Sequence, residues 1–139
     1  MKKLFSLFIV LTLMACSSAI SPYDIARKIP KNTNKTIIFN VNAANNSASN
    51  LILAGMMKTS SGGINKQLMD LVTNDNLNIG ISGKSQMLNK VAATYVIENG
   101  KFGKNTKLFM VGDSEQDKKE LEQSANTKNI PFEYFLVDK

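Results

Sequence analysis

Thr36-Ile37-Ile38-Phe39-Asn40-Val41 is the first of four short runs that are rich in β-branched and aromatic residues. Runs of this kind, bounded by polar residues, are typical of buried β-strands. The other three cover residues 77–82, 107–111 and 132–137. Residues 77–82 alternate with period two, which predicts a strand with apolar side chains on one side only. These four strands set the frame of the expected fold.

Helical patterns separate the four runs. Residues 51–57 are apolar enough for a closely packed helix, and residues 60–63, Ser-Ser-Gly-Gly, interrupt the chain before a second amphipathic stretch over 64–72. Two further helices are predicted over 88–96 and after residue 114. The order strand, helix pair, strand, helix, strand, helix, strand predicts an α/β domain with a mostly parallel sheet, because each helix supplies a crossover. With helices on both faces, we expect a small three-layer Rossmann-like sandwich of about four strands.

A chain of 139 residues holds one domain, which the strand pattern places at residues 36–139. Residues 16–35 are irregular and rich in serine, proline and asparagine, which predicts a flexible tether. The alternative is a short helical turn over residues 23–29 that lies on the domain, since Ile25 and Ile29 are four positions apart.

The N-terminus has the pattern of an export signal. Lys2 and Lys3 precede an apolar run over residues 4–14, which is too short to span a bilayer. The next residues, Leu13-Met14-Ala15-Cys16, resemble the lipobox of bacterial lipoproteins, in which an aliphatic residue stands three positions before an obligatory cysteine and a small residue directly before it. The alternatives are an ordinary signal peptide with an unrelated cysteine and a buried N-terminal helix.

The resemblance to lipoproteins covers about the first 18 residues and implies a membrane anchor. Residues 1–15 would be removed as a signal peptide, and the thiol of Cys16 would then carry diacylglycerol. Two or three acyl chains hold a protein on a membrane without spanning it. By the family's sorting rule for Gram-negative bacteria, Ser17 implies the outer membrane, with the domain facing the periplasm.

Composition excludes several classes of site. The chain has 17 basic and 11 acidic residues, and removal of Lys2 and Lys3 leaves a mature net charge of +4. The lysines are scattered, which favours a solvated basic surface over nucleic-acid binding. The single cysteine, once acylated, leaves no thiol for a disulfide, and the absence of histidine removes the commonest general base and a common metal ligand. We therefore expect no metal and no cofactor.

Ligands of open parallel sheets bind at the carboxyl ends of the strands, near a reversal in strand order. Three segments at such ends carry the candidate residues, which are Asn42, Asn45 and Asn46, then Ser82, Gly83, Lys84 and Ser85, then Gly112, Asp113 and Ser114. For the last segment, plain helix capping is favoured over a carboxylate in a crevice.

The middle segment matches part of the phosphate-binding P-loop pattern. Gly83, Lys84 and Ser85 fit its last three positions, but Asn78 stands where the first glycine belongs. The apolar alternation up to residue 81 also predicts that the strand continues where the loop should be. We therefore interpret the segment as a tight turn followed by Ser85 as a helix N-cap.

These exclusions favour binding over catalysis. The leading hypothesis is a non-catalytic envelope lipoprotein that serves as an interaction subunit of a larger periplasmic or outer-membrane assembly, for example a secretion, conjugation or pilus apparatus. The alternative is a domain that binds a small ligand or phosphate ester through the asparagines, Lys84 and Asp113. An NTPase is the least favoured hypothesis.

Overall fold

The computed structural model describes residues 20–44, 46–59 and 63–137. The predicted signal peptide, Cys16 and Asn45 lie outside the described residues. The elements in chain order are α2 (Pro22–Lys28), β1 (Lys35–Asn40), α3 (Ser47–Thr59), α4 (Gly63–Val72), β2 (Leu77–Ser82), α5 (Gln86–Asn99), β3 (Lys107–Gly112), α6 (Glu115–Thr127) and β4 (Phe132–Leu136).

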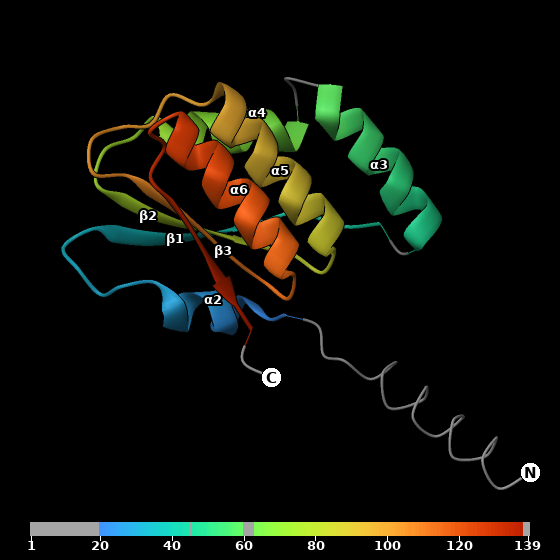
Figure 1. Cartoon of the computed structure of the whole chain (residues 1–139), viewed down its shortest axis with the longest axis horizontal. Helices are drawn as coiled ribbons and strands as arrows, with labels where there is room; N and C mark the ends of the chain where they lie inside the picture. The colour runs from blue at the N-terminus through green and yellow to red at the C-terminus, as the bar shows by residue number, and fades with distance from the viewer. Residues whose placement is uncertain (1–19, 45, 60–62, 138–139) are drawn as a thin grey trace, which may run out of the picture.

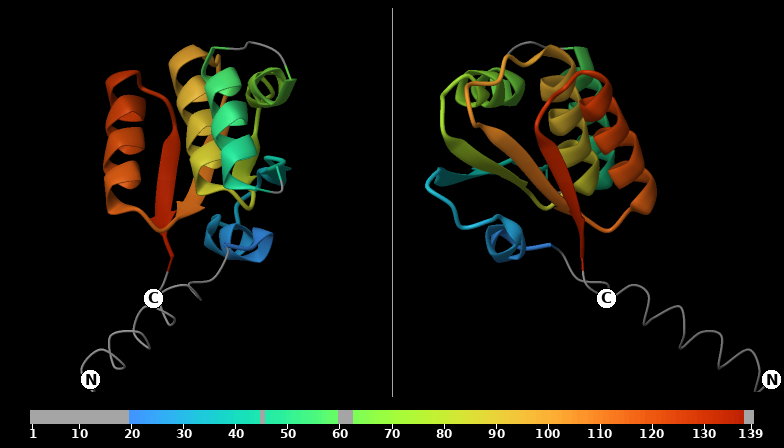
Figure 2. Two further views of the ribbon diagram at one scale, coloured as in Figure 1. Left: turned by 90° about the vertical axis from the view of Figure 1, so that its right-hand side faces the viewer. Right: turned by 60° about the vertical axis from the view of Figure 1, so that its left-hand side comes forward.

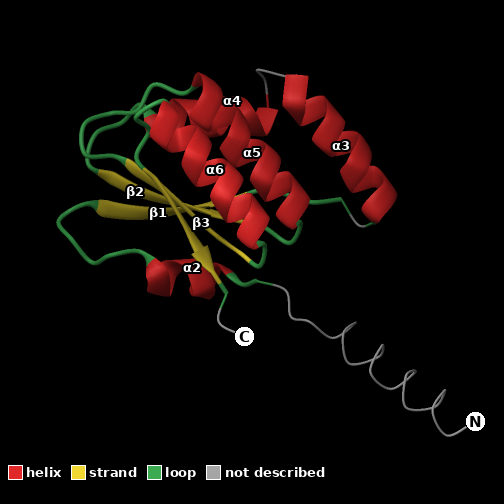
Figure 3. Cartoon of the chain, viewed as in Figure 1, coloured by secondary structure: helices red, strands yellow, loops and turns green. Residues whose placement is uncertain are grey.

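The four strands form one parallel sheet in the order β1-β2-β3-β4. Helices α3, α4, α5 and α6 lie on one side of this sheet, and α2 lies on the other (Figure 1). Two further views show the same arrangement from the sides (Figure 2), and the colouring by secondary structure separates the three layers (Figure 3). The predicted α/β sandwich with a parallel sheet and helices on both faces is confirmed.

The alternation in β2 explains why the two faces of the sheet differ. Leu77, Ile79 and Ile81 belong to the large core beneath the four helices, together with Met110 and Tyr134 from the neighbouring strands. The even-numbered residues of β2 point to the opposite face because side chains alternate along a strand. Strand β2 is short, as expected, but it is buried on both faces, because α2 covers the second one.

Helix α2 covers the second face through a small core of its own. Ile25 and Ile29 pack there against Phe109 and Val111, and the Phe109 ring stacks on that of Phe135 with centroids 6.0 Å apart. A Cβ added at Gly80 would lie 3.0 Å from the Cδ1 atoms of both isoleucines. The helix therefore approaches the β2 backbone closely, because residue 80 has no side chain.

This packing corrects the predicted tether. The segment from residue 20 to residue 29 is part of the packed domain, and the alternative of a short helix resting on the sheet is the one that the structure has. The sequence predicted both faces to be covered, but it did not identify this helix as the cover of the second face.

The strand order follows the chain order without a reversal. Right-handed crossovers that all proceed in one direction place their helices on one face of the sheet, which is where α3 to α6 lie. A reversal in strand order, beside which ligands of open parallel sheets bind, is therefore absent from these four strands. Among the described residues, no helix is long and apolar enough to cross a membrane.

Candidate functional site

The carboxyl ends of the strands do meet at one edge of the sheet. The backbone N–H of Val41 donates to the carbonyl of Ser82 at 2.7 Å, and that of Val137 donates to the carbonyl of Gly112 at 2.9 Å. These bonds continue the β1–β2 and β3–β4 pairings beyond the strands. The three predicted segments therefore follow one another along this edge, with Asn45 outside the described residues.

The segment after β2 is a turn and a helix cap. Strand β2 continues to Ser82, so the chain is still extended where a phosphate loop would begin. The Ser85 hydroxyl accepts a hydrogen bond from the N–H of Leu88 at 3.3 Å, at the start of α5, and Lys84 is exposed to solvent. The predicted interpretation as a turn with Ser85 as N-cap is confirmed.

Asn89 holds this turn in place, and sequence reasoning missed it. Its side-chain amide donates to the carbonyl of Gly83 at 3.0 Å, and the residue is only 2% exposed. A Cβ at Gly83 would lie 2.5 Å from Asn89 Oδ1 and 2.6 Å from the carbonyl oxygen of Val41. Gly83 is therefore required for close packing here. In the sequence, Asn89 is only a polar residue near the start of a predicted helix, and no motif there indicates that it would bond the turn.

The segment after β3 is also a cap. The Ser114 hydroxyl accepts a hydrogen bond from the N–H of Asp117 at 3.1 Å, and the Ser114 N–H donates to the Tyr134 hydroxyl at 3.3 Å. Tyr134 is fully buried, and burial raises the pKa of its phenol. A Cβ at Gly112 would overlap the Tyr134 hydroxyl, and Asp113 is exposed. The favoured capping interpretation is confirmed.

The described asparagines at this edge make local bonds. The Asn40 side-chain amide donates to Asn42 Oδ1 at 2.8 Å, and Asn46 Oδ1 accepts from the N–H of Ser49 at 2.8 Å, near the start of α3. Most of the predicted residues thus lie at this one edge of the sheet. Their hydrogen bonds there stabilise turns and the first turns of helices. In the described part of the chain, no group of three or more acidic, histidine or cysteine residues could hold a metal ion.

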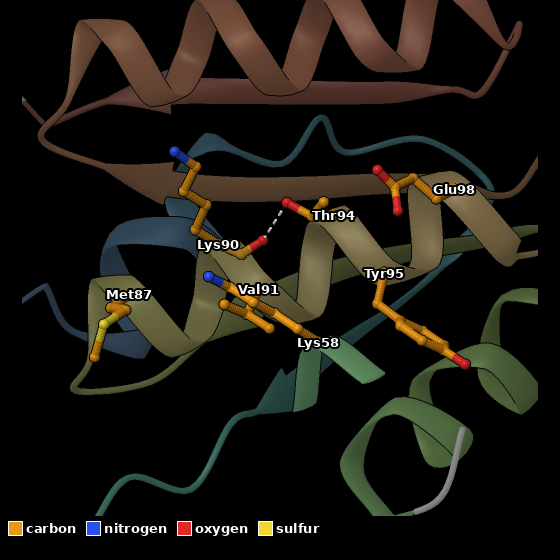
Figure 4. A pocket seen from close by; sticks show the side chains of 7 residues that line it. All are labelled: Lys58, Met87, Lys90, Val91, Thr94, Tyr95 and Glu98. Carbon is orange, nitrogen blue, oxygen red and sulfur yellow. Dashed lines mark hydrogen bonds between the residues drawn. The ribbon is translucent and has the colours of Figure 1, made fainter. Parts of the chain in front are cut away.

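A groove of about 490 Å³ lies along α5 (Figure 4). Its lining residues are Lys58, Met87, Lys90, Val91, Thr94, Tyr95 and Glu98. Lys90 Nζ lies 2.8 Å from both Asp117 Oδ1 and Glu120 Oε2 of α6. Hydrogen bonds to these carboxylates raise the pKa of Lys90, and its ammonium lowers the pKa of Glu120. The lysine thus links two helices.

Three large apolar side chains are exposed on α3, the helix that contributes Lys58 to this groove. Leu51 is 63% exposed, Ile52 is 68% exposed and Met56 is 62% exposed. The same helix packs against α5 and buries Ala54 and Met57 on its inner side. We call Leu51, Ile52 and Met56 the α3 apolar face.

This face corrects the prediction of a helix that is closely packed over residues 51–57. The stretch is apolar throughout, so its sequence cannot separate the side that packs on α5 from the side that faces solvent. The structure makes that separation.

No protein-family model, curated protein or solved structure matches this chain.

Proposed function

We propose that this protein is a lipid-anchored, non-catalytic envelope lipoprotein that acts as an interaction subunit of a larger periplasmic or outer-membrane assembly, such as a secretion, conjugation or pilus apparatus. The observation that carries this proposal is the α3 apolar face. Two adjacent aliphatic side chains, Leu51 and Ile52, stand about two-thirds exposed on a helix that is otherwise fixed to the domain. Clustered exposed apolar side chains mark interaction surfaces.

The chemistry of α3 indicates the kind of partner. Lys58, near its C-terminal end, is the only charged residue in the helix. Interface cores are more apolar than the rest of a protein surface, depleted of charge and enriched in methionine and aromatic side chains. Full burial of a large aliphatic side chain is worth about 1.5–3 kcal/mol. The face therefore suits a protein partner that presents an apolar helix or groove.

The N-terminal pattern supports the anchor. The basic residues, the short apolar run and the sequence Leu13-Met14-Ala15-Cys16 together fit a lipoprotein signal. Acyl chains on Cys16 would hold the domain at the membrane, and Ser17 supports the outer membrane. The domain would then meet its partner in the periplasm.

The alternative is a small-ligand or phosphate-ester site at the sheet edge. It has less support, because Ser85 and Ser114 already cap helices and Asn89 closes the turn at Gly83. These serines are engaged in holding the fold, whereas Lys84 and Asp113 are exposed beside them.

A pull-down of the full chain from its own envelope tests the proposal. The wild type is compared with Leu51→Glu, with Ile52→Glu and with Gln123→Glu, an exposed control on α6. We expect one large partner in stoichiometric amount with the wild type and the control, and loss of that partner with both α3 variants. Equal capture by all four proteins would contradict the α3 interface.

The anchor has a separate test. Cys16→Ala should abolish lipid labelling and leave uncleaved or soluble protein. A variant that stays with the membranes after a high-salt wash would contradict the lipoprotein assignment.

A further inference from the structure

The packed domain begins very close to the predicted lipid. Ile20 already packs against the core formed by Ile25, Ile29, Phe109 and Val111. Only residues 17–19 separate it from Cys16. Four Cα steps span at most about 14 Å when fully extended. A domain of this size is roughly 30–40 Å across, so the link keeps Ile20 within less than half a domain width of a bilayer that holds Cys16.

The side of the molecule nearest to this link is basic. Residues 20–31 contain Arg27, Lys28 and Lys31 against a single acid, Asp24. Arg27 pairs with Asp24 at 2.7 Å. This segment therefore carries a net charge of +2 on the side of the sheet that α2 covers.

The opposite layer is less basic, because α3 carries one lysine, α4 and α5 are each neutral, and α6 is acidic. Helix α6 contains four acidic residues and two lysines, a net charge of −2. It lies across the sheet from α2 (Figure 2). An anionic surface within a Debye length, about 8–10 Å, would attract the α2 side and repel the α6 side.

Helix α2 also presents an aromatic ring. Tyr23 is 78% exposed, at the end of α2 that lies nearest in sequence to Cys16. Tyrosine is enriched at membrane–water interfaces, where its ring lies at the level of the headgroups.

We propose that the α2 side of the domain lies against the headgroups of the bilayer that holds Cys16, with anionic phospholipid as its partner and the four-helix layer facing away. This inference rests on the proposed lipid anchor. The short link limits the distance, and the charge difference between α2 and α6 fixes which side faces the lipid. The docked surface is made by Tyr23, Arg27 and Lys28.

The chain has no tryptophan, so a single tryptophan can report its position. The full chain with Tyr23→Trp is expressed with its signal, and the mature lipid form is reconstituted into phosphatidylcholine–phosphatidylglycerol vesicles that contain a headgroup nitroxide lipid. Gln123→Trp, exposed on α6, is the matched control. Mass spectrometry of the N-terminal peptide first establishes whether Cys16 is acylated.

We expect the nitroxide to quench the indole of the Tyr23→Trp variant severalfold more than that of the Gln123→Trp variant. Arg27→Gln with Lys28→Gln, or vesicles without phosphatidylglycerol, should reduce that difference. Equal quenching of the two probes on an acylated protein would overturn the docking inference and leave the anchor intact. A peptide without acyl chains would instead overturn the proposed anchor, and the docking inference with it.

Discussion

The side-chain amide of Asn89 donates a hydrogen bond to the backbone carbonyl of Gly83 at 3.0 Å, inside the turn that joins β2 to α5. Because Asn89 is buried, its removal leaves a carbonyl without this donor and without access to a full water shell. We expect Asn89→Ala to lower the free energy of unfolding by about 1–3 kcal/mol, measured by urea denaturation. Asn99→Ala is the matched control, since its amide bonds the Tyr95 carbonyl at an exposed position of the same helix. Equal losses in both variants would contradict a special role for Asn89.

The turn itself gives a second prediction. Ser85→Ala should lower the free energy of unfolding by about 0.5–2 kcal/mol, because the first turn of α5 loses its cap. Lys84→Ala should change it by less than about 0.5 kcal/mol, because Lys84 is exposed. Calorimetric titration of the wild type with Mg-ATP and Mg-GTP should show no binding. Micromolar binding that disappears in Lys84→Ala would instead support a phosphate site.

Helix α2 should be integral to stability. Ile25 is 1% exposed in the small core on the second face of the sheet. Ile25→Ala should therefore cost about 2–5 kcal/mol of unfolding free energy. Tyr23→Ala changes an exposed residue of the same helix and should cost less than about 0.5 kcal/mol. If thermal and urea unfolding of the two variants coincide, the packing of α2 on the sheet is not needed for the fold.

The start of α2 should respond to acid. Asp24 Oδ2 accepts hydrogen bonds from the Ser21 N–H at 2.8 Å and the Ser21 hydroxyl at 3.1 Å. The backbone bond from Ser21, followed by Arg27, lowers the pKa of Asp24 below its usual 3.8. A lowered folded-state pKa stabilises the fold above the unfolded pKa, and this contribution disappears as the pH falls through the folded pKa.

The wild type should therefore melt above Asp24→Asn at neutral pH, and the difference in melting temperature should shrink as the pH falls below about 4. NMR titration of the Asp24 carboxyl carbon gives the folded pKa directly. A difference that stays constant down to the lowest pH would show that the carboxylate charge contributes nothing to α2.

The strands could be predicted because the side chains within each run indicate a strand without information from the rest of the chain. The β-branched and aromatic runs that begin at Thr36 and Leu77 match the observed strands to within a residue. The caps at Ser85 and Ser114 were predictable for a similar reason, since a capping side chain acts on backbone groups only a few residues away.

The packing of α2 and the order of the strands depend on contacts between distant parts of the chain. Helix α2 is stable because Gly80, much later in the sequence, leaves room for Ile25 and Ile29. Ile25 and Ile29 stand in a stretch rich in proline and asparagine, and this local sequence does not indicate that they pack against a distant glycine. The sequence pattern also does not indicate the order of the strands in the sheet. It therefore could not show that a reversal, at which a crevice could form, is absent from these four strands.

The strand order has a consequence for how the molecule is made. Because each strand pairs with the one just before it in the chain, a polypeptide that emerges N-terminus first can add β2, β3 and β4 in turn. Each of these pairings spans a crossover, from Lys35 to Leu77 in the first case, so it is non-local and slow to form, but it needs no later part of the chain. Helix α2 is the exception. Its isoleucines rest on Gly80 and on Phe109 and Val111, so the first helix to be synthesised must wait for the third strand before it can pack.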